Sequence, residues 1–301
     1  MNRAPIALFV YNRPRHTQAT LAALRANTLA PQSDLYVFSD APRKPEAAQS
    51  VAQVRESLRS IDGFKSVTVV ERTANMGLAA SITEGLNGLC ERHGRAIVVE
   101  DDLATSPHFL DYMNAALARY EPEERVMQIS GHMFVARLAT TDDAIFLPFI
   151  TSWGWATWAR AWRHYDPLAL DYPRLLEDPA LRRRFDLNGH YPYFRMLQAQ
   201  QRGKIDSWAI RWYLSVFFRD GLALYPKKSM VRNLGFDGSG VNCNVSDFAQ
   251  SELDSDFRVN AMPDAVETTG EIETVYRALP VPRLSWTSVL SRASRMLRIG
   301  A

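Results

Sequence analysis

The sequence has few cysteines, almost no net charge and no long apolar run. Cys90 and Cys243 are too few and too far apart for a disulfide framework or a zinc site. Reduced thiols are therefore expected, as is usual in the cytoplasm. The net charge of +2 over 301 residues gives no general attraction to nucleic acid.

No stretch approaches the roughly 20 apolar residues that a membrane-spanning helix needs. The apolar run at residues 5–10 is also too short for the core of a signal peptide. We therefore expect a cytoplasmic protein that is not integral to a membrane.

Glycine-rich nucleotide motifs are missing as well. No G-x-G-x-x-G follows the first apolar run, and there is no Walker A sequence and no G-x-S-x-G elbow. The six histidines show no pairing at metal-ligand spacing and favour structural or surface roles. These absences argue against dinucleotide-binding, P-loop and serine-hydrolase interpretations.

What the first half does contain is an alternation of two periods. Short β-branched or aromatic runs predict buried strands at residues 5–10, 34–39, 66–70, 96–99 and 126–129. Helical patterns lie between them, from about residue 14, at 46–60, at 78–92 and from Ser106, which resembles an N-cap followed by a proline. This alternation predicts an α/β fold with a mostly parallel central sheet flanked by helices.

Tryptophan becomes dense after about residue 140, with six of the seven between residues 153 and 212. Helices are expected at 180–185, 191–202 and 207–218. The last residues, 281–301, are rich in arginine and place apolar side chains on one helical face. They fit a basic amphipathic helix on an anionic membrane surface, or equally a terminal helix packed on the domain.

Three neighbouring acids, Glu100, Asp101 and Asp102, follow the predicted strand at 96–99. Ligands of parallel α/β sheets bind beyond the carboxyl ends of the strands, and we expect this turn to be exposed there. Such oxygen ligands suit Mg²⁺ or Mn²⁺ shared with substrate phosphates. The alternative is a solvated acidic turn favoured by the dipole of the following helix.

Around this cluster, AIVVEDDLATSPHFLDYMNAAL (residues 96–117) resembles the animal N-acetylglucosaminyltransferase I family. Four other stretches are similar to that family in the same order: PIALFVYNRP (5–14), VFSD (37–40), TSWGWATWARAW (151–162) and IDSWAIRW (205–212). The resemblance covers roughly residues 4–240 and extends to bacterial sugar transferases of polysaccharide clusters. It implies a GT-A type fold and an inverting, metal-dependent glycosyltransferase.

The resemblance also implies roles for individual residues. Asp102 would ligate Mn²⁺ (or Mg²⁺), and Lewis-acid assistance to the leaving diphosphate would follow. The nucleotide sugar would be bound by Arg13, Asp40, Asn75, Glu100 and Asp101. Asp40 would contact the uracil. From the residues themselves, the helix start at Asn75 either offers backbone N–H groups to the donor or is an ordinary helix start.

For catalysis, the resemblance points to Asp206 as the base that takes the acceptor proton. The aromatic faces of Trp153, Trp155 and Trp208 would bind the acceptor, and their apolar surroundings would raise the pKa of Asp206. Alternatively the tryptophans are core residues and Asp206 is the N-cap of the next helix. Only one aspartate is present in this stretch, and if the base of the family aligns with Ser207 the assignment fails.

Two further departures concern the region after residue 234. No late histidine ligand is found near residues 241–243, where many transferases of this fold have one. The loop GFDGSG (235–240) fits a flexible loop closing over the donor phosphates, or an ordinary glycine-rich turn.

Together these features predict a transferase that moves sugar from a UDP-sugar or other nucleotide sugar to a glycan or lipid-linked acceptor in bacterial surface polysaccharide synthesis. Residues 1–140 would form the nucleotide-sugar-binding half and 141–280 the acceptor-binding and catalytic half of one and the same GT-A domain. Residues 281–301 would form a basic amphipathic tail in contact with the inner membrane face. Two alternatives are a sugar-nucleotide pyrophosphorylase, disfavoured because YNRPRHTQ contains no glycine, and a non-catalytic sugar- or partner-binding module.

Overall fold

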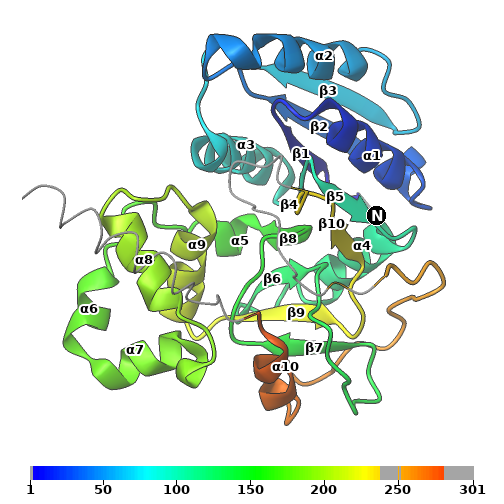
Figure 1. Cartoon of the computed structure of the whole chain (residues 1–301). Helices are drawn as coiled ribbons and strands as arrows, with labels where there is room; N and C mark the ends of the chain where they lie inside the picture. Colours follow the sequence, from blue (N-terminus) through cyan, green and yellow to red (C-terminus); the bar gives the residue numbers. More distant parts are fainter. Residues whose placement is uncertain (1–2, 238–249, 251, 281–301) are drawn as a thin grey trace, which may run out of the picture.

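The computed structural model of the chain describes residues 3–237, 250 and 252–280. Its centre is an eight-stranded sheet with the order β3-β2-β1-β4-β8-β6-β9-β7 (Figure 1). Six of these strands run in one direction, while β8 and β7 run against them. The predicted α/β fold with a mostly parallel sheet is therefore confirmed. The predicted tail, Cys243 and residues 241–243 lie outside the described residues.

The strands of the sheet are β1 (Ile6–Val10), β2 (Asp34–Ser39), β3 (Ser66–Glu71), β4 (Arg95–Glu100), β6 (Val126–Ser130), β7 (Ala144–Leu147), β8 (Trp155–Trp158) and β9 (Leu222–Pro226). A separate antiparallel pair is formed by β5 (Leu103–Thr105) and β10 (Val231–Asn233). Strand β5 follows β4 directly in the chain, so the small pair stands beside the edge at which the parallel strands end.

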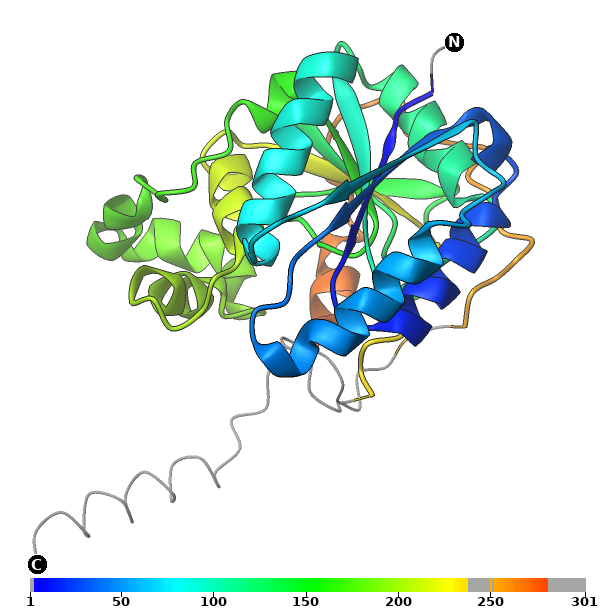
Figure 2. The same ribbon diagram turned by 90° about the horizontal axis from the view of Figure 1, so that it is seen from above.

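The helices are α1 (Pro14–Arg25), α2 (Ala48–Leu58), α3 (Leu78–His93), α4 (Phe109–Arg119), α5 (Ala159–Trp162), α6 (Tyr172–Glu177), α7 (Pro179–Phe185), α8 (Tyr193–Gln201), α9 (Trp208–Phe217) and α10 (Ile272–Ala278). Helices α1, α2 and α4 cover one face of the sheet, and α3, α5 and α9 cover the other (Figure 1). Helices α6, α7 and α8 extend to the side away from α1 and α2 (Figure 2). No helix in the described part of the chain is both long and apolar enough to cross a bilayer.

The two faces explain why the strand sequences are apolar throughout. In β4, Ala96 and Val98 pack into the core under α3, while Ile97 and Val99 pack under α1 and α4. Successive side chains of a strand point to opposite faces, and both faces of this sheet are covered. The predicted strand at 66–70 is an exception, because β3 is an edge strand whose side chains are exposed or half-buried.

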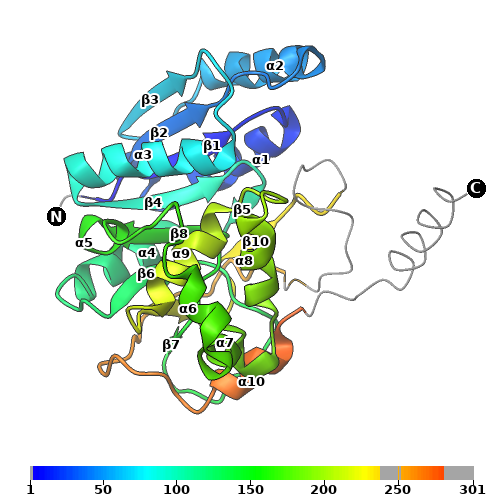
Figure 3. The ribbon, with the colours of Figure 1, turned by 90° about the vertical axis from the view of Figure 1, so that its left-hand side faces the viewer.

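Strand β8 joins the two halves of the chain into one sheet. It lies between β4 and β6, pairing Val98 with Trp155 and Ile129 with Ala156. A strand from beyond residue 140 is thus inserted among those from before it (Figure 3). The proposed division at residue 140 therefore separates segments of sequence that share a single sheet.

The structure corrects one local sequence expectation and assigns one stretch for which no element was predicted. Helix α4 begins at Phe109 rather than at Ser106, because residues 103–105 are held in strand β5 by pairing with β10. The tryptophan-rich stretch after Gly154 is strand β8 for four residues before a short helix begins, because it completes the ladder between β4 and β6.

Most of the tryptophans form a buried cluster behind the sheet. Trp155 is 0% exposed and stacks on Trp208, which is 3% exposed, with ring centroids 5.0 Å apart. Trp162 and Trp212 pack against Trp155 from α5 and α9. Neither Trp155 nor Trp208 has a face available to an acceptor, so the acceptor-binding role predicted for them is wrong and they are core residues.

This assignment predicts different costs for two neighbouring substitutions. Replacing Trp155 by alanine should lower the free energy of unfolding by about 3–5 kcal/mol, because a fully buried ring leaves a cavity. Trp153→Ala, at a half-buried position two residues earlier, should cost clearly less. Guanidinium unfolding curves of the two variants compare them, and equal costs would contradict the core assignment of Trp155.

Candidate functional site

The three acids mark the point where β4 ends at the carboxyl edge of the sheet. Glu100 is the last residue of β4, and Asp101 and Asp102 form the turn to β5. Contrary to the expectation from the sequence, the turn is buried, since Asp101 and Asp102 are only 9% and 8% accessible. Strand β10 and the residues after it cover this turn, and the carboxylates are therefore held away from bulk water.

Arg13 supplies the positive charge that faces these acids. Its Nη1 lies 2.8 Å from Asp102 Oδ2 and 3.9 Å from Asp101 Oδ1. Arg13 precedes Pro14, the first residue of α1, and it is itself almost buried. The same helix anchors the turn from below, where Thr20 Oγ1 donates to the carbonyl of Asp101. Buried ion pairs need such additional bonds to offset the cost of desolvation.

The electrostatics of the cluster favour protonation of two of its acids. Burial and then repulsion from Asp102 raise the pKa of Asp101 to about 7, although Arg13 and the N–H of Tyr11 oppose the shift. Burial and the two neighbouring aspartates likewise raise the pKa of Glu100 well above its usual range. If all three acids were ionised, they would carry more negative charge than one guanidinium balances, so protons are retained instead, and a bound cation would replace those protons.

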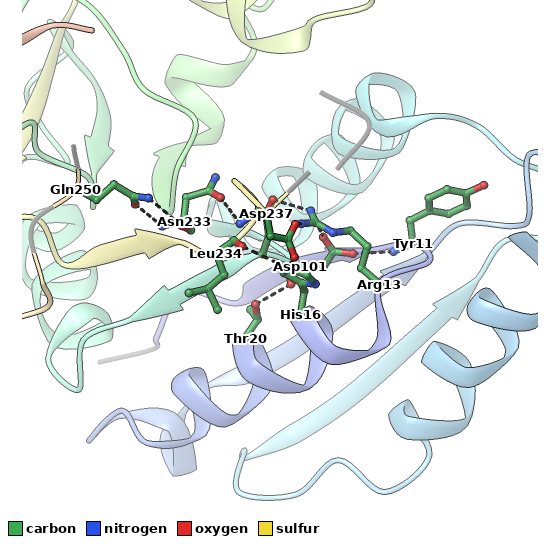
Figure 4. Close-up of polar contacts among 11 residues, drawn as sticks. Tyr11, Arg13, His16, Thr20, Asp101, Asn233, Leu234, Asp237 and Gln250 are labelled. Carbon is green, nitrogen blue, oxygen red and sulfur yellow. Dashed lines mark hydrogen bonds and ion pairs between the residues drawn. The ribbon is translucent and has the colours of Figure 1, made fainter. Parts of the chain in front are cut away.

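A segment distant in sequence, residues 233–237, closes over the acidic turn (Figure 4). The N–H of Leu234 donates to the carbonyl of Asp102 at 2.7 Å. Asp237 reaches His16 Nε2 at 3.2 Å and Arg13 Nη2 at 3.8 Å, which links the segment to α1. Asn233 and Gln250 exchange two hydrogen bonds, with the backbone of Asn233 as both donor and acceptor.

Asp40 and Asn75 lie together, but their polar groups are engaged with each other. The carboxylate of Asp40 accepts the N–H groups of Ala41, Met76 and Gly77 and the side-chain amide of Asn75. These four donors fill the usual acceptor sites of a carboxylate. The structure therefore gives Asp40 the task of fixing the loop before α3, and neither it nor the N–H groups of residues 76 and 77 are free for uracil or donor phosphates.

Trp153, unlike Trp155 and Trp208, lies at the edge of the sheet where the site is. Because β8 runs against β4 and β6, the residues before it lie at the same edge as Asp102. Its ring is 5.5 Å from that of Phe236 in the covering segment and 4.4 Å from that of His132. Burial lowers the pKa of His132 to about 3, so that ring packs against Trp153 as a neutral imidazole.

Asp206 stands apart from the acidic cluster, although at the same end of the sheet. It precedes α9, whose first residue Trp208 stacks on Trp155, the partner of Val98 in β4. Its side chain is 66% exposed and pairs with Arg211 at 2.7 Å. The N-cap of α9 is Ser207, which excludes the N-cap alternative for Asp206. High exposure also removes the predicted desolvation of Asp206 by tryptophan.

The chemistry of these residues fits a divalent ion only in part. Among residues 3–237, 250 and 252–280, no three His, Cys, Asp or Glu side chains converge to hold a metal by themselves. Ions such as Mg²⁺ are commonly held by one or two carboxylates together with substrate phosphates. Asp102 and its acidic neighbours fit this second arrangement, in which substrate oxygens complete the coordination.

Sequence reasoning missed three members of the site: His16, Gly235 and Asp237. His16 lies three residues after Arg13 and therefore on the same side of the first turn of α1, a spacing that could have been read. Gly235 and Asp237 belong to a loop that the sequence singled out, but nothing local reveals that it packs on Asp102 and on Arg13, both more than 100 positions earlier.

No family model and no curated protein matches this sequence. Among solved structures, it is similar to GalNAc-T7 with UDP, GalNAc and Mn²⁺ (9% identity, 78% of this chain, 45% of that chain, TM-score 0.47). A mannosyltransferase from Pyrobaculum calidifontis with GDP-Man and Mn²⁺ (15%, 52% and 44%, 0.35) is also similar. So is mouse xyloside xylosyltransferase 1 in its apo form (13%, 72% and 82%, 0.36).

The chain spans less than half the length of the first solved structures that it matches. With TM-scores below 0.5, these likenesses carry no argument about activity, which is drawn instead from the residues of the site.

Gly235 offers a direct test of the packing over the acidic turn. A Cβ at this position would overlap Asp102 Oδ2 and lie 2.9 Å from Arg13 Nη2. Gly235→Ala should therefore push the covering segment or the Asp102 carboxylate aside, which lowers thermal stability. Gly270→Ala is the matched control, because no atom of the described part of the chain lies within 4 Å of a Cβ added there. Equal melting temperatures for both variants and the wild type would contradict the described contact.

The raised pKa of Asp101 predicts how stability depends on pH without added metal. Between its unfolded value of 3.8 and about 7, the folded state keeps a proton that the unfolded state has lost. The contribution of Asp101 to stability therefore falls as pH rises through this window and is constant above it. Asp101→Asn, which stays uncharged, should be more stable than the wild type at pH 8, by up to a few kcal/mol.

The measurement is urea unfolding of both proteins at pH 4.5 and pH 8 in the presence of a chelator. The advantage of Asp101→Asn should shrink at the lower pH, where the wild-type carboxyl is protonated as well. An advantage of the same size at both values would show that burial of charge at Asp101 is not its source.

Proposed function

We propose that the protein is a glycosyltransferase that uses a nucleotide-diphosphate sugar and inverts the anomeric centre. The observation that carries this proposal is the buried pair Asp101 and Asp102 at the carboxyl edge of the sheet, held by Arg13 and covered by residues 233–237. Clustered carboxyl groups at this edge suit a cation that also binds phosphate. The resemblance of the ordered motifs to the N-acetylglucosaminyltransferase I family agrees with this.

Arg13 would bind the donor diphosphate directly. Its Nε and Nη2 are buried and have no hydrogen-bond partner among the residues that the structure describes, although Nη2 lies 3.8 Å from a carboxylate oxygen of Asp237. Buried donors without acceptors are costly, and a guanidinium matches the geometry of phosphate oxygens. Diphosphate oxygens at this position would therefore satisfy groups that the protein leaves open.

Asp102 would hold Mn²⁺ or Mg²⁺, with the donor completing the coordination. A bound divalent ion at this position would neutralise the charge that develops on the leaving diphosphate. Asp237 lies close enough to Arg13 to stand in for the late histidine that is missing near residues 241–243. Glu100 and Asp101 would contact sugar or ribose hydroxyls, for which protonated carboxyls serve as donors.

Asp206 would act on the acceptor. Its Oδ takes the proton of the acceptor hydroxyl while that oxygen attacks the anomeric carbon, and the bond to the diphosphate breaks on the opposite side. Arg211 Nη2 holds one carboxylate oxygen and thereby fixes the orientation of the group. Trp153, beside Phe236 at the same edge, would present an apolar face to the acceptor.

The acceptor is proposed to be a glycan or a lipid-linked sugar, and the donor a UDP-sugar. Among the alternatives, a pyrophosphorylase would need a glycine-rich loop where this chain has Arg13, Pro14 and the start of α1. A non-catalytic module on the same fold would neither bind UDP together with a metal ion nor transfer the sugar of a UDP-sugar. The following experiment separates this last interpretation from the proposed enzyme.

Asp102→Asn should abolish metal-dependent donor binding while leaving the fold in place. We expect the affinity for UDP in the presence of Mn²⁺ to fall by about hundredfold or more, because the variant loses the carboxylate that pairs with the ion. Titration calorimetry measures this, and release of UDP from UDP-sugars measures turnover. Asp62→Asn is the matched control, an exposed aspartate paired with Arg25.

Undiminished binding and hydrolysis in Asp102→Asn would overturn the metal assignment. Absence of any UDP binding by the wild type, with Mn²⁺ and each common nucleotide sugar, would favour the non-catalytic module.

A further inference from the structure

An exposed loop between α5 and α6 presents two leucines to solvent. Leu168 and Leu170 are 70% and 72% exposed, whereas Ala169 between them is 2% exposed. Single exposed leucines are ordinary on a protein surface, but a pair on one projecting loop is not. The loop is therefore a candidate contact surface, provided that it is held in this conformation.

Several interactions hold the loop in place. The carboxylate of Asp166 accepts the N–H groups of both Leu168 and Leu170, and its own N–H donates to Ser215 Oγ on α9. Ala169 adopts a φ of 54°, which is costly for a residue with a Cβ. This conformation turns the methyl group of Ala169 inward and both leucines outward, so their exposure is built into the fold.

Arg211 joins this loop to the exposed segment at residues 201–206. Its Nη1 donates to the carbonyl of Pro167, and its Nη2 pairs with Asp206. Ile205, 38% exposed, thereby adds a third apolar side chain near the two leucines. We name Leu168, Leu170 and Ile205, together with the neighbouring cations Arg202 and Lys204, the leucine surface.

The stretch of chain that carries the leucine surface has an excess of positive charge, since residues 163–220 carry ten Lys and Arg against seven Asp and Glu. The aspartates next to the apolar side chains, Asp171 and Asp206, are each paired with an arginine, Arg174 and Arg211. Three of the other acids accept hydrogen bonds from backbone N–H groups: Asp166 from Leu168, Asp178 at the N-cap of α7, and Asp186 from Phe194. Arg202 and Lys204 are exposed and make no ion pair within the described part of the chain.

Apolar tips flanked by cations match the interface of an anionic bilayer. The tips enter the boundary between headgroups and acyl chains, while Lys and Arg bind the headgroups. A protein partner is a poorer match, because a stable interface needs roughly 800 Å² on each side and large aromatic anchors. The surface has three separate apolar side chains and no exposed aromatic ring.

We propose that the leucine surface docks the protein onto an anionic lipid bilayer. The leucine surface lies on the part of the molecule built around α6–α8 (Figure 1). Asp206 belongs to the same exposed segment, so docking would turn the acceptor side of the site toward the lipid. Only this last consequence rests on the proposed function; the docking itself requires neither donor nor metal.

The test is flotation of the full chain with vesicles of phosphatidylglycerol and phosphatidylcholine, without nucleotide or metal. The double variant Leu168→Ser and Leu170→Ser should bind at least about tenfold more weakly, because two apolar side chains no longer enter the bilayer. Val135→Ser is the matched control, since this valine is 56% exposed elsewhere. Its binding should equal that of the wild type.

Charge reversal gives an independent arm if the serine variant does not fold. Arg202→Glu with Lys204→Glu should reduce binding to anionic vesicles and reduce its dependence on salt. Equal binding of wild type and folded variants, or no binding by the wild type, would overturn the proposal. Sedimentation velocity that shows a dimer abolished by the leucine substitutions would assign the surface to a second copy instead.

Because this assay contains no donor or metal, its result is independent of the UDP titrations. Vesicle binding without UDP binding would refute the proposed enzyme and support the docking surface. UDP binding without vesicle binding would support the enzyme and refute the docking surface.

Discussion

The guanidinium of Arg13 is the interaction on which the rest of the site depends. It faces Asp101, Asp102 and Asp237, three carboxylates brought together from two distant parts of the chain. Without a cation between them, these groups would repel one another in a region from which water is largely excluded. The first turn of α1 fixes the position of Arg13, and the ends of β4 and β10 are positioned around it.

This arrangement explains why the site combines an irregular loop with a rigid sheet. Strands β1 and β4 are buried on both faces, so the backbone at Glu100 has little freedom to move. The covering segment is joined to that rigid edge by a few polar contacts: Leu234 on the Asp102 carbonyl, and Asp237 on α1. In a site of this kind the acids at the sheet edge are held fixed, whereas the loop that covers them can differ more freely between related proteins.

The sequence was sufficient for the parallel strands and their helices, because each carries its own periodicity. Runs such as residues 34–39 are apolar on both faces, and the helices α1, α2 and α3 begin and end close to where their patterns do. Strand β8 was not foreseen, since four residues containing two tryptophans fit a helix or a strand. Only the pairing of these residues with β4 and β6 makes them a strand rather than a helix.

The site was predictable to a similar degree. The acids at 100–102 follow a recognisable strand, and Arg13 follows another, so their meeting at one edge could be inferred. The burial of individual side chains could not be inferred from the sequence. Trp155 and Trp208 have no exposed ring face for an acceptor, and the carboxylate oxygens of Asp40 already accept hydrogen bonds from the protein. Contacts across more than 200 residues, such as that of His16 with Asp237, leave no local mark in either segment.

The place of β8 in the sheet has a consequence for how the protein emerges from the ribosome. Strand β4 gains one neighbour, β1, early in synthesis, but its other edge stays unpaired until residues 155–158 have appeared. Unpaired edges of apolar strands invite pairing with other chains. A nascent chain halted before β8 would expose such an edge beside the acidic turn, and quality-control factors would meet the incomplete site there.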